Sequence, residues 1–380
     1  MPKLLYVTKS LFYPESAGGG QQSSLHLFSS LRQRGWQIEV ICRISRHSQY
    51  FGTLRRKRWL GRLLLQNPPY FIKDEDLGYP CWRGIMHEDK VEQWLERCLY
   101  EYQPDVVFSD NCGASIKSQL SLISHAAYQG YSTFFFIRSV DDIKSGKLDC
   151  NIPDRIHAIA NSPFAASIIG SFTSNEVGIV LPFVDLNRYQ VTGRDRRYIT
   201  FINPIPEKGV EVATEVARRL PEERFLFVKG KWAGYTYTGQ EPWMKPIYAL
   251  PNVEVWEHQQ DTRQIYAVTD ILLVPSQFYE TFGRVILEAQ VNTIPVVAAN
   301  VGGIPYTLGQ GGILATPGDD PDAYVDALQR LRTDEGFYKQ LSNLAFQNSQ
   351  RPEFESEYQV NNFISFVECH LNHRAVSSLS

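Results

Sequence analysis

The chain has 380 residues, 43% hydrophobic and 13% aromatic, a composition that suits a soluble globular protein with a well-filled core. Its 38 basic residues are balanced by 41 acidic ones, so the overall charge gives no reason to expect nucleic acid as a partner. Six cysteines without a C-x-x-C pair, and no apolar run of the ~18 to 20 residues that span a bilayer, argue against a disulfide framework, a zinc site and a membrane span. The length predicts two domains, and a first strand without a leader predicts a cytoplasmic protein.

Strand-like and helical runs alternate along the first half of the chain, which is typical of a parallel sheet wrapped by helices. We expect strands at 4–8, 37–41, 105–109, 133–137 and 157–160, and helices at about 21–34 and 88–102. These elements predict one doubly wound, Rossmann-like domain over residues 1–185.

A glycine loop, Gly18-Gly19-Gly20, lies between the first expected strand and the first expected helix. Glycine lets the backbone come close to a ligand and adopt positive φ angles. The loop lacks the G-x-G-x-x-G pattern of nicotinamide-binding domains, and Glu39 falls inside the second strand and not at its end. We interpret the loop either as a flexible turn or as a ligand contact made by Gly19 and Gly20.

A basic segment follows the second strand. Residues 43–62 include seven basic side chains and no acidic ones, and three leucines come directly after them. This mixture suits a surface lying on anionic lipid, where each charge contributes about 1 kcal/mol, but it equally suits a solvated face. Further on, Asp74-Glu75-Asp76 has the form of a metal-binding D-x-D motif. No strand is expected before it, so we interpret it as a polar loop.

The second half of the chain repeats the alternation. We expect strands at 198–202, 225–228, 253–255, 271–274 and 296–298, and helices at 207–220, 321–333, 335–347 and 353–371. The elements predict a second Rossmann-like domain over residues 186–365.

Two glutamates in this half stand eight positions apart around a tight turn. Glu280 falls in the loop after an apolar strand, and Glu288 falls on a short apolar helix that Gly283 opens. The first N–H groups of such a helix, together with its dipole, are suited to bind phosphate. One carboxylate can then bind sugar hydroxyls and the other a ribose diol, so the pattern predicts a nucleotide-sugar site.

The run E-x-F-G-x-x-x-x-E-A at 280–289 resembles the signature of the retaining family 4 glycosyltransferases (glycosyl transferases group 1), which have the GT-B fold. The segments INPIPEKG at 202–209 and VGGIP at 301–305 resemble two further motifs of that family. The resemblance implies an α/β, GT-B architecture with two doubly wound Rossmann-like domains facing across a cleft. The first would bind the acceptor and the second the nucleotide-sugar donor, with the C-terminal helix, 366–380, crossing back onto the first.

The resemblance also implies roles for individual residues. Glu280 would hold sugar hydroxyls and Glu288 the ribose, while Lys208 and the helix N-terminus at Phe282 and Gly283 would stabilise the departing diphosphate. Further donor contacts are expected from Lys229, Gly230, His258 and Thr281. His258 has a structural role as its alternative. We expect no metal and no separate cofactor, since the nucleotide sugar is itself the substrate and the eight histidines show no H-x-x-x-H spacing.

The chain departs from the family pattern where the family usually has an arginine after glycine. Asn203 stands there and supplies hydrogen bonds but no charge. Because a phosphate site without metal relies on preorganised positive charge, we hypothesise that Arg284 reaches the β-phosphate, with Lys229 and Arg138 as other candidates.

A second departure concerns a histidine that the family often carries near the reacting sugar. Arg138 stands in its place after the strand expected at 133–137. Arg138 is expected either to orient the donor sugar or a phosphate-bearing acceptor, or to form an ordinary ion pair with Asp141 or Asp142.

With the resemblance, these residues predict a retaining, metal-independent hexosyltransferase. It would move a hexose, with UDP-glucose as the first guess for the donor, to a hydroxyl of a saccharide or lipid-linked acceptor in the synthesis of a cell-surface polysaccharide or glycolipid. The alternatives are a nucleotide-sugar-binding protein with weak or lost catalysis and a GT-B-like nucleotide-sugar epimerase. If the basic segment lies on lipid, residues 43–65 would hold the cytoplasmic protein peripherally on the inner face of the plasma membrane.

Overall fold

The computed structural model describes residues 1–16, 18–45, 47–54, 71–84, 88–147, 151–230, 237–238 and 241–371. The chain divides into two compact units. Unit 1 is made of Met1–Asn161, Ala165–Val180 and Gln359–Ser380, and unit 2 of Ser162–Phe164 and Leu181–Tyr358. The division in the structure therefore lies at Val180, and the chain returns to unit 1 at Gln359. The sequence pattern predicts these two points at residues 185 and 366.

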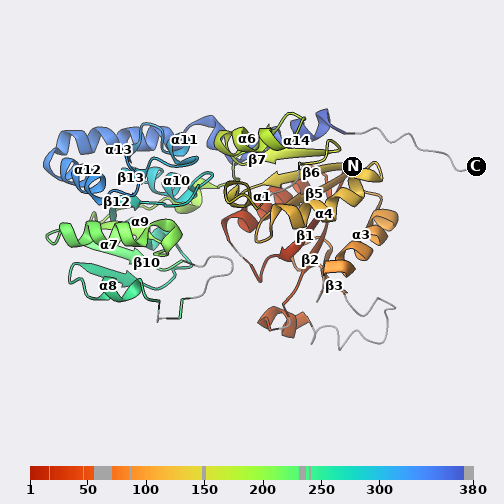
Figure 1. Cartoon of the computed structure of the whole chain (residues 1–380), viewed down its shortest axis with the longest axis horizontal. Helices are drawn as coiled ribbons and strands as arrows, with labels where there is room; N and C mark the ends of the chain where they lie inside the picture. Colours follow the sequence, from red (N-terminus) through yellow and green to blue (C-terminus); the bar gives the residue numbers. More distant parts are fainter. Residues whose placement is uncertain are drawn as a thin grey trace, which may run out of the picture. The chain divides into compact units, whose positions relative to one another are not determined.

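Unit 1 is built on an eight-stranded sheet in the order β3-β4-β2-β1-β5-β6-β7-β8. The strands β2, β1, β5, β6 and β7 are labelled in Figure 1. All neighbouring strands are parallel except β3 and β4. The strands are β1 (Lys3–Leu11), β2 (Gln37–Arg43), β3 (Phe71–Asp74), β4 (Cys81–Gly84), β5 (Val106–Asp110), β6 (Ser132–Ile137), β7 (Ile156–Ala160) and β8 (Gly178–Ile179). The central strands β5 and β6 are buried along their whole length, as expected of parallel strands covered on both faces.

Most helices of unit 1 lie between successive strands of its sheet, and the last one ends the chain. They are α1 (Gly19–Gln33), α3 (Glu88–Tyr102), α4 (Ile116–Tyr128), α5 (Asp141–Lys144), α6 (Pro163–Ile169) with the 3-10 turn Gly170–Phe172, and the last helix α14 (Ser356–Cys369). Ser115 caps α4 by accepting a hydrogen bond from the backbone N–H of Ser118. Phe363 of α14 packs edge-on against Phe108 of β5, so the end of the chain contributes to the core of unit 1.

Unit 2 contains a six-stranded sheet in the order β11-β10-β9-β12-β13-β14, and every neighbouring pair is parallel. The strands are β9 (Tyr198–Ile202), β10 (Phe225–Val228), β11 (Val253–Trp256), β12 (Thr269–Val274), β13 (Val296–Ala299) and β14 (Gly312–Ala315). Because all six strands run the same way, their carboxyl ends lie at one edge of the sheet, where open parallel sheets bind ligands.

The helices of unit 2 cover both faces of this sheet. They are α7 (Val210–Arg219), α8 (Met244–Tyr248), α9 (Arg263–Val268), α10 (Arg284–Gln290), α11 (Ile304–Leu308), α12 (Pro321–Thr333) and α13 (Glu335–Ser349), with 3-10 turns at Leu186–Tyr189, Pro206–Lys208 and Pro352–Phe354. One buried cluster joins α7, α12 and α13 to the sheet, and another joins α10 and α11 to it.

One expected helix begins later than the sequence pattern predicts. The expected helix at 207–220 is found as the 3-10 turn Pro206–Lys208 followed by α7, which starts at Val210. Gly209 separates them with φ 82°, and a Cβ on it would lie 1.8 Å from the carbonyl oxygen of Pro275. Lys208 therefore stands on a tight turn ahead of the helix, and only glycine fits the position after it.

Within the residues that the structure describes, no helix has the length and apolarity needed to cross a bilayer.

Candidate functional site

The carboxyl edge of the unit 2 sheet brings Lys208 and Glu280 together. Lys208 comes from the turn after β9 and Glu280 from the loop after β12, the neighbouring strand. The ammonium of Lys208 donates a hydrogen bond to Oε2 of Glu280 and lies 4.6 Å from the ring centroid of Phe278. The two side chains are only 22% and 17% exposed, so the ion pair is partly shielded from water. The structure thus places a cation and a carboxylate in contact at this edge.

Two glycines fix the backbone that carries Glu280. The carbonyl oxygen of Glu280 accepts a hydrogen bond of 2.7 Å from the N–H of Gly303. A Cβ on Gly302 would lie 2.3 Å from that same oxygen, and a Cβ on Gly303 would lie 1.9 Å from the carbonyl oxygen of Thr281. The glycine turn at 301–305 is therefore required so that this segment can pack directly against the loop with the first glutamate.

Glu288 lies on α10 and is mostly buried, at 7% exposure. Its Oε2 accepts a hydrogen bond of 2.7 Å from the hydroxyl of Tyr266, and its Oε1 lies 3.6 Å from Arg284. Arg284 also donates a 3.0 Å hydrogen bond to the hydroxyl of Tyr189. Burial, followed by the nearby carboxylate of Glu288, raises the pKa of Tyr266 well above its ordinary value, so Tyr266 stays a hydrogen-bond donor.

Asn203 follows β9 and adopts a left-handed conformation with φ 66°. Its Oδ1 accepts a 2.9 Å hydrogen bond from the hydroxyl of Tyr237. A Cβ on Gly230 would lie 2.7 Å from the same oxygen, so the glycine leaves room for the amide. Next to Gly230, Lys229 forms a 2.6 Å hydrogen bond with Glu257, which is the main cause of the raised pKa of Lys229. These five residues form a second cluster at the same sheet edge.

Four other predicted residues have different surroundings. Thr281 and Phe282 are buried, and Phe282 packs against Phe354 with their ring centroids 6.0 Å apart. Gly283 has φ 80° and begins the seven-residue helix α10. His258 is exposed, two residues after the end of β11.

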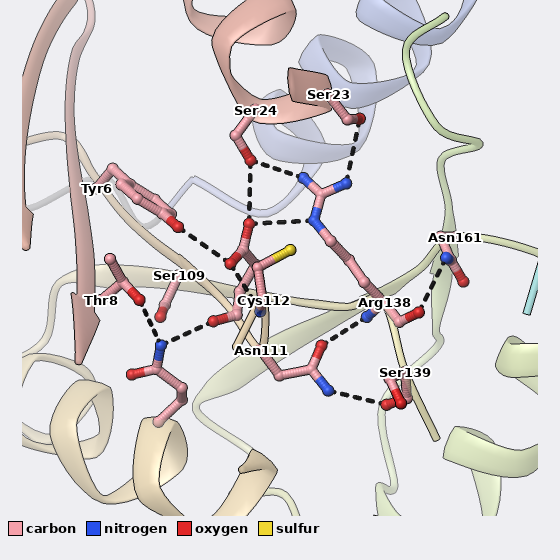
Figure 2. Close-up of polar contacts among 12 residues, drawn as sticks. Tyr6, Thr8, Ser23, Ser24, Ser109, Asn111, Cys112, Arg138, Ser139 and Asn161 are labelled. Atoms are coloured by element: carbon pink, nitrogen blue, oxygen red, sulfur yellow. Dashed lines mark hydrogen bonds and ion pairs between the residues drawn. The ribbon is translucent and has the colours of Figure 1, made fainter. Parts of the chain in front are cut away.

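Arg138 belongs to unit 1 and lies in a buried polar network at the carboxyl ends of β5 and β6 (Figure 2). Its Nε donates to the carboxylate of Asp110 at 3.1 Å, and its two Nη atoms donate to the hydroxyls of Ser23 and Ser24 at 3.1 and 2.9 Å. The ion pair that the structure shows for Arg138 is with Asp110, the last residue of β5.

Asp110 is the centre of this network. In addition to Arg138, its carboxylate accepts hydrogen bonds from the hydroxyls of Tyr6 and Ser24, each 3.0 Å long, and from the N–H of Cys112 at 3.1 Å. Both Asp110 and the hydroxyl groups around it are buried, so the negative charge is held by fixed donors in place of water.

The glycine loop meets the same network. Gly20 lies in the first turn of α1, and a Cβ on it would lie 2.0 Å from Sγ of Cys112 and 3.3 Å from Cδ of Arg138. Gly19, the first residue of α1, is exposed. The structure therefore brings Gly20 and Arg138 together, and it explains Gly20 by close packing.

Two sequence features remain. Asp74 ends strand β3, so a strand does precede the D-x-D run, and the carboxylate of Asp74 pairs with the buried guanidinium of Arg83 at 2.5 Å.

Most of the basic segment at 43–65, including 46 and 55–65, lies outside the described residues. In the part of the chain that the structure describes, no three His, Cys, Asp or Glu side chains are arranged to hold a metal ion.

Several residues at these sites are not identified from the sequence. Tyr266, Tyr189 and Tyr237 each bind a predicted residue through a hydroxyl group, and Asp110 binds Arg138. The sequence offered one signal for Asp110, which was its place at the end of an apolar strand. Arg138 was identified from a similar place, directly after such a strand.

A family model described as "Glycosyl transferases group 1" matches residues 196–334. This segment includes the clusters around Lys208, Asn203 and Glu288. Among curated proteins, the D-inositol 3-phosphate glycosyltransferase of Corynebacterium diphtheriae is 34% identical over 122 residues, and the sulfoquinovosyl transferase of Arabidopsis thaliana is 35% identical over 137 residues. The matches cover 30% and 33% of this chain and only 28% and 24% of those proteins.

Solved structures match nearly the whole chain. The sucrose-phosphate synthase from Thermosynechococcus elongatus has a TM-score of 0.72 at 15% identity, covering 97% of this chain and 99% of that one. HepE of Anabaena, solved in complex with UDP-glucose, has a TM-score of 0.73 at 16% identity with the same coverage. At such low identity the likeness shows the fold alone: two Rossmann-like domains with parallel sheets, as in GT-B glycosyltransferase structures, which confirms the expected fold class.

Proposed function

We propose that this chain is a glycosyltransferase that moves a hexose from a nucleotide sugar to an acceptor hydroxyl, with retention at the anomeric carbon and without a metal ion. The observation that carries the proposal is the contact of Lys208 with Glu280 at the carboxyl edge of the unit 2 sheet. A diphosphate needs a cation and a sugar needs a hydrogen-bond acceptor, and these two side chains supply both. The match of residues 196–334 to the glycosyl transferases group 1 model supports the same assignment.

In this proposal the donor is held at two points of unit 2. Lys208 binds the diphosphate and Glu280 accepts hydrogen bonds from sugar hydroxyls. Glu288 accepts from the ribose, and Tyr266 and Arg284 hold its carboxylate in place. A carboxylate has about four lone-pair sites, so one hydrogen bond from Tyr266 leaves acceptor capacity for a diol.

The transfer step follows from these contacts. The bond between the anomeric carbon and the phosphate oxygen breaks as the acceptor oxygen bonds to that carbon from the same face. The acceptor's proton goes to the departing phosphate oxygen, whose growing negative charge Lys208 stabilises. Preorganised charge of this kind contributes roughly 3 to 4 kcal/mol per donor in enzymes that stabilise an oxyanion.

For the donor we propose UDP-glucose, which the similarly folded HepE of Anabaena binds in its solved complex. For the acceptor we propose a saccharide or a lipid-linked saccharide in the synthesis of a cell-surface polysaccharide or glycolipid. The proposed location is the cytoplasm, with peripheral contact to the plasma membrane through residues 43–65.

The test is a transfer assay with UDP-, GDP- and ADP-glucose, each offered with soluble saccharides and with a bacterial lipid extract. We expect a glycosylated product with retained anomeric configuration by NMR, made from one donor, and a loss of at least about 100-fold in Glu280→Gln. Glu257→Gln, which alters an ion pair at the same sheet edge, should keep at least half of the wild-type rate. Conversion of the sugar without an acceptor would instead support an epimerase.

A second candidate function is a nucleotide-sugar-binding protein without catalysis. The observation that favours it is Asn203, whose amide oxygen binds Tyr237 at a position where the resemblance implies a cation. Binding of one nucleotide sugar with no product from any acceptor in the panel would support this second function.

A further inference from the structure

Lys208 and Glu280 occupy the candidate site by pairing with each other. The two groups that a sugar diphosphate would need are bound to each other, and each side chain is largely shielded from water. Their backbones are fixed: the N–H of Lys208 bonds to the carbonyl oxygen of Ile205 at 3.0 Å, and Glu280 bonds to Phe278 and Gly303 at 2.7 Å each. The ion pair can therefore separate by rotation of the two side chains, without breaking these backbone hydrogen bonds.

Because of the ion pair, binding of the diphosphate and binding of the sugar affect each other. A diphosphate that takes Lys208 removes the partner of Glu280 and adds negative charge beside its partly buried carboxylate. A carboxylate left without its partner in such a place is costly, and like charges increase that cost. A sugar on the diphosphate changes the outcome, because its hydroxyls donate hydrogen bonds to the carboxylate that the ammonium has left.

We propose that Glu280 is a specificity-determining residue that makes the site favour a nucleotide sugar over the free nucleoside diphosphate. This inference rests on the function proposed above. Glu280 competes with the diphosphate for Lys208 unless sugar hydroxyls engage its carboxylate. After transfer the sugar leaves, Glu280 pairs again with Lys208, and the diphosphate product is released.

A second ion pair at the same edge provides a matched control. Lys229 follows β10, Glu257 follows β11, and their side chains are 2.6 Å apart. The side chain of Glu257 is 79% exposed, so water solvates its carboxylate when Lys229 turns away. Neutralising Glu257 should therefore change the affinities for a diphosphate and its sugar ester by the same factor and leave their ratio unchanged.

The experiment is calorimetric titration of the full chain with UDP, UDP-glucose and inorganic pyrophosphate. In Glu280→Gln we expect UDP and pyrophosphate to bind about tenfold more tightly, which is about 1.4 kcal/mol, while UDP-glucose changes by less than about threefold. In Glu257→Gln the ratio of the Kd values for UDP and UDP-glucose should stay within about twofold of wild type. Thermal unfolding of each variant checks that it is folded.

A double variant isolates the competition. In a Lys208→Met background, Glu280→Gln should tighten UDP less than it does with Lys208 present, because only the repulsion between carboxylate and diphosphate is relieved and there is no ammonium to compete for. An unchanged or weaker affinity for UDP in Glu280→Gln alone, with wild type binding UDP-glucose, would overturn this inference and leave the proposed function intact. If wild type binds none of the three ligands, both the inference and the donor-site assignment are wrong.

Discussion

The side chains that carry positive charge at the candidate donor site are each engaged in a different contact. Asn203 adds no positive charge to the site. The left-handed backbone of Asn203 suits asparagine better than most residues, and its amide is engaged by Tyr237. Arg284 is held by Glu288 and Tyr189. To reach a β-phosphate, as hypothesised from the sequence, Arg284 would have to exchange the tyrosine hydroxyl for the phosphate.

The variant Arg284→Ala tests whether Arg284 binds the β-phosphate. We expect the affinity for UDP-glucose to fall by about tenfold or more, because a charge-assisted hydrogen bond is lost, while the affinity for uridine, which has no phosphate, stays within about twofold. Arg188→Ala removes a nearby arginine that is 77% exposed and should change neither. An equal loss for uridine would mean that Arg284 acts on the ribose side through Glu288, and a change below about twofold for both ligands would exclude the phosphate role.

Elements were predictable where apolar periodicity is strong and less so where glycine or a long-range contact decides. The strand at 198–202 and the helix at 321–333 are found with the predicted limits. Gly209 shortens the helix before it can include Lys208, because its left-handed backbone leaves the helical path. The short strand Gly312–Ala315 was not predicted, since four residues beside a run of glycines give no periodicity.

The candidate site was predictable to the same extent. Glu280, Glu288 and Lys208 were identifiable from a motif because they are close in sequence to glycine turns that the family pattern includes. Their contacts were not predictable: Tyr266 reaches Glu288 from another helix, and Asp110 reaches Arg138 from another strand. Such pairs are set by sheet order and side-chain rotamers, which the spacing of residues along one segment does not encode.

The Asp110–Arg138 pair anchors α1 to the sheet of unit 1, and its removal should cost stability. We expect Asp110→Asn or Arg138→Met alone to destabilise unit 1 by about 3 to 5 kcal/mol, because each leaves a buried charge without its partner. The double variant should lose less free energy of unfolding than the sum of the losses in the two single variants. The control is the exposed pair Arg97–Glu101 on α3, where Arg97→Met should cost less than about 1 kcal/mol. Urea unfolding of each variant measures these values, and additive losses would contradict the coupling.

At the scale of the whole molecule, the chain forms two units and its last helix packs in the first. α14 brings His370 to His157 of β7, with the two rings 4.5 Å apart, and a Cβ on Gly178 would lie 2.8 Å from the ring of Phe366. Burial, and then the charge of His370, lowers the pKa of His157 below its usual value of about 6.5. The folded state therefore favours a neutral imidazole at this contact.

This shift predicts that unit 1 loses stability in mild acid. Below pH ~6.5 the unfolded chain binds a proton at His157 before the folded chain does, so the free energy of unfolding falls as the pH is lowered from about 7.5 to 5.5. His157→Phe removes this contribution, so the stability of the wild type relative to the variant should decrease over that range. Thermal unfolding of both proteins at the two pH values provides the measurement. A difference that stays constant or grows in acid would contradict the assignment.

The central claim is that the carboxyl edge of the unit 2 sheet binds the diphosphate of a nucleotide sugar through Lys208. Calorimetric titration of wild type and Lys208→Met with UDP-, GDP- and ADP-glucose tests it most directly. We predict that one of the three binds the wild type, and that the variant, while folded, binds it at least about 30-fold more weakly, which is about 2 kcal/mol. Equal affinity in the variant, or no binding of any of the three to the wild type, would contradict the account.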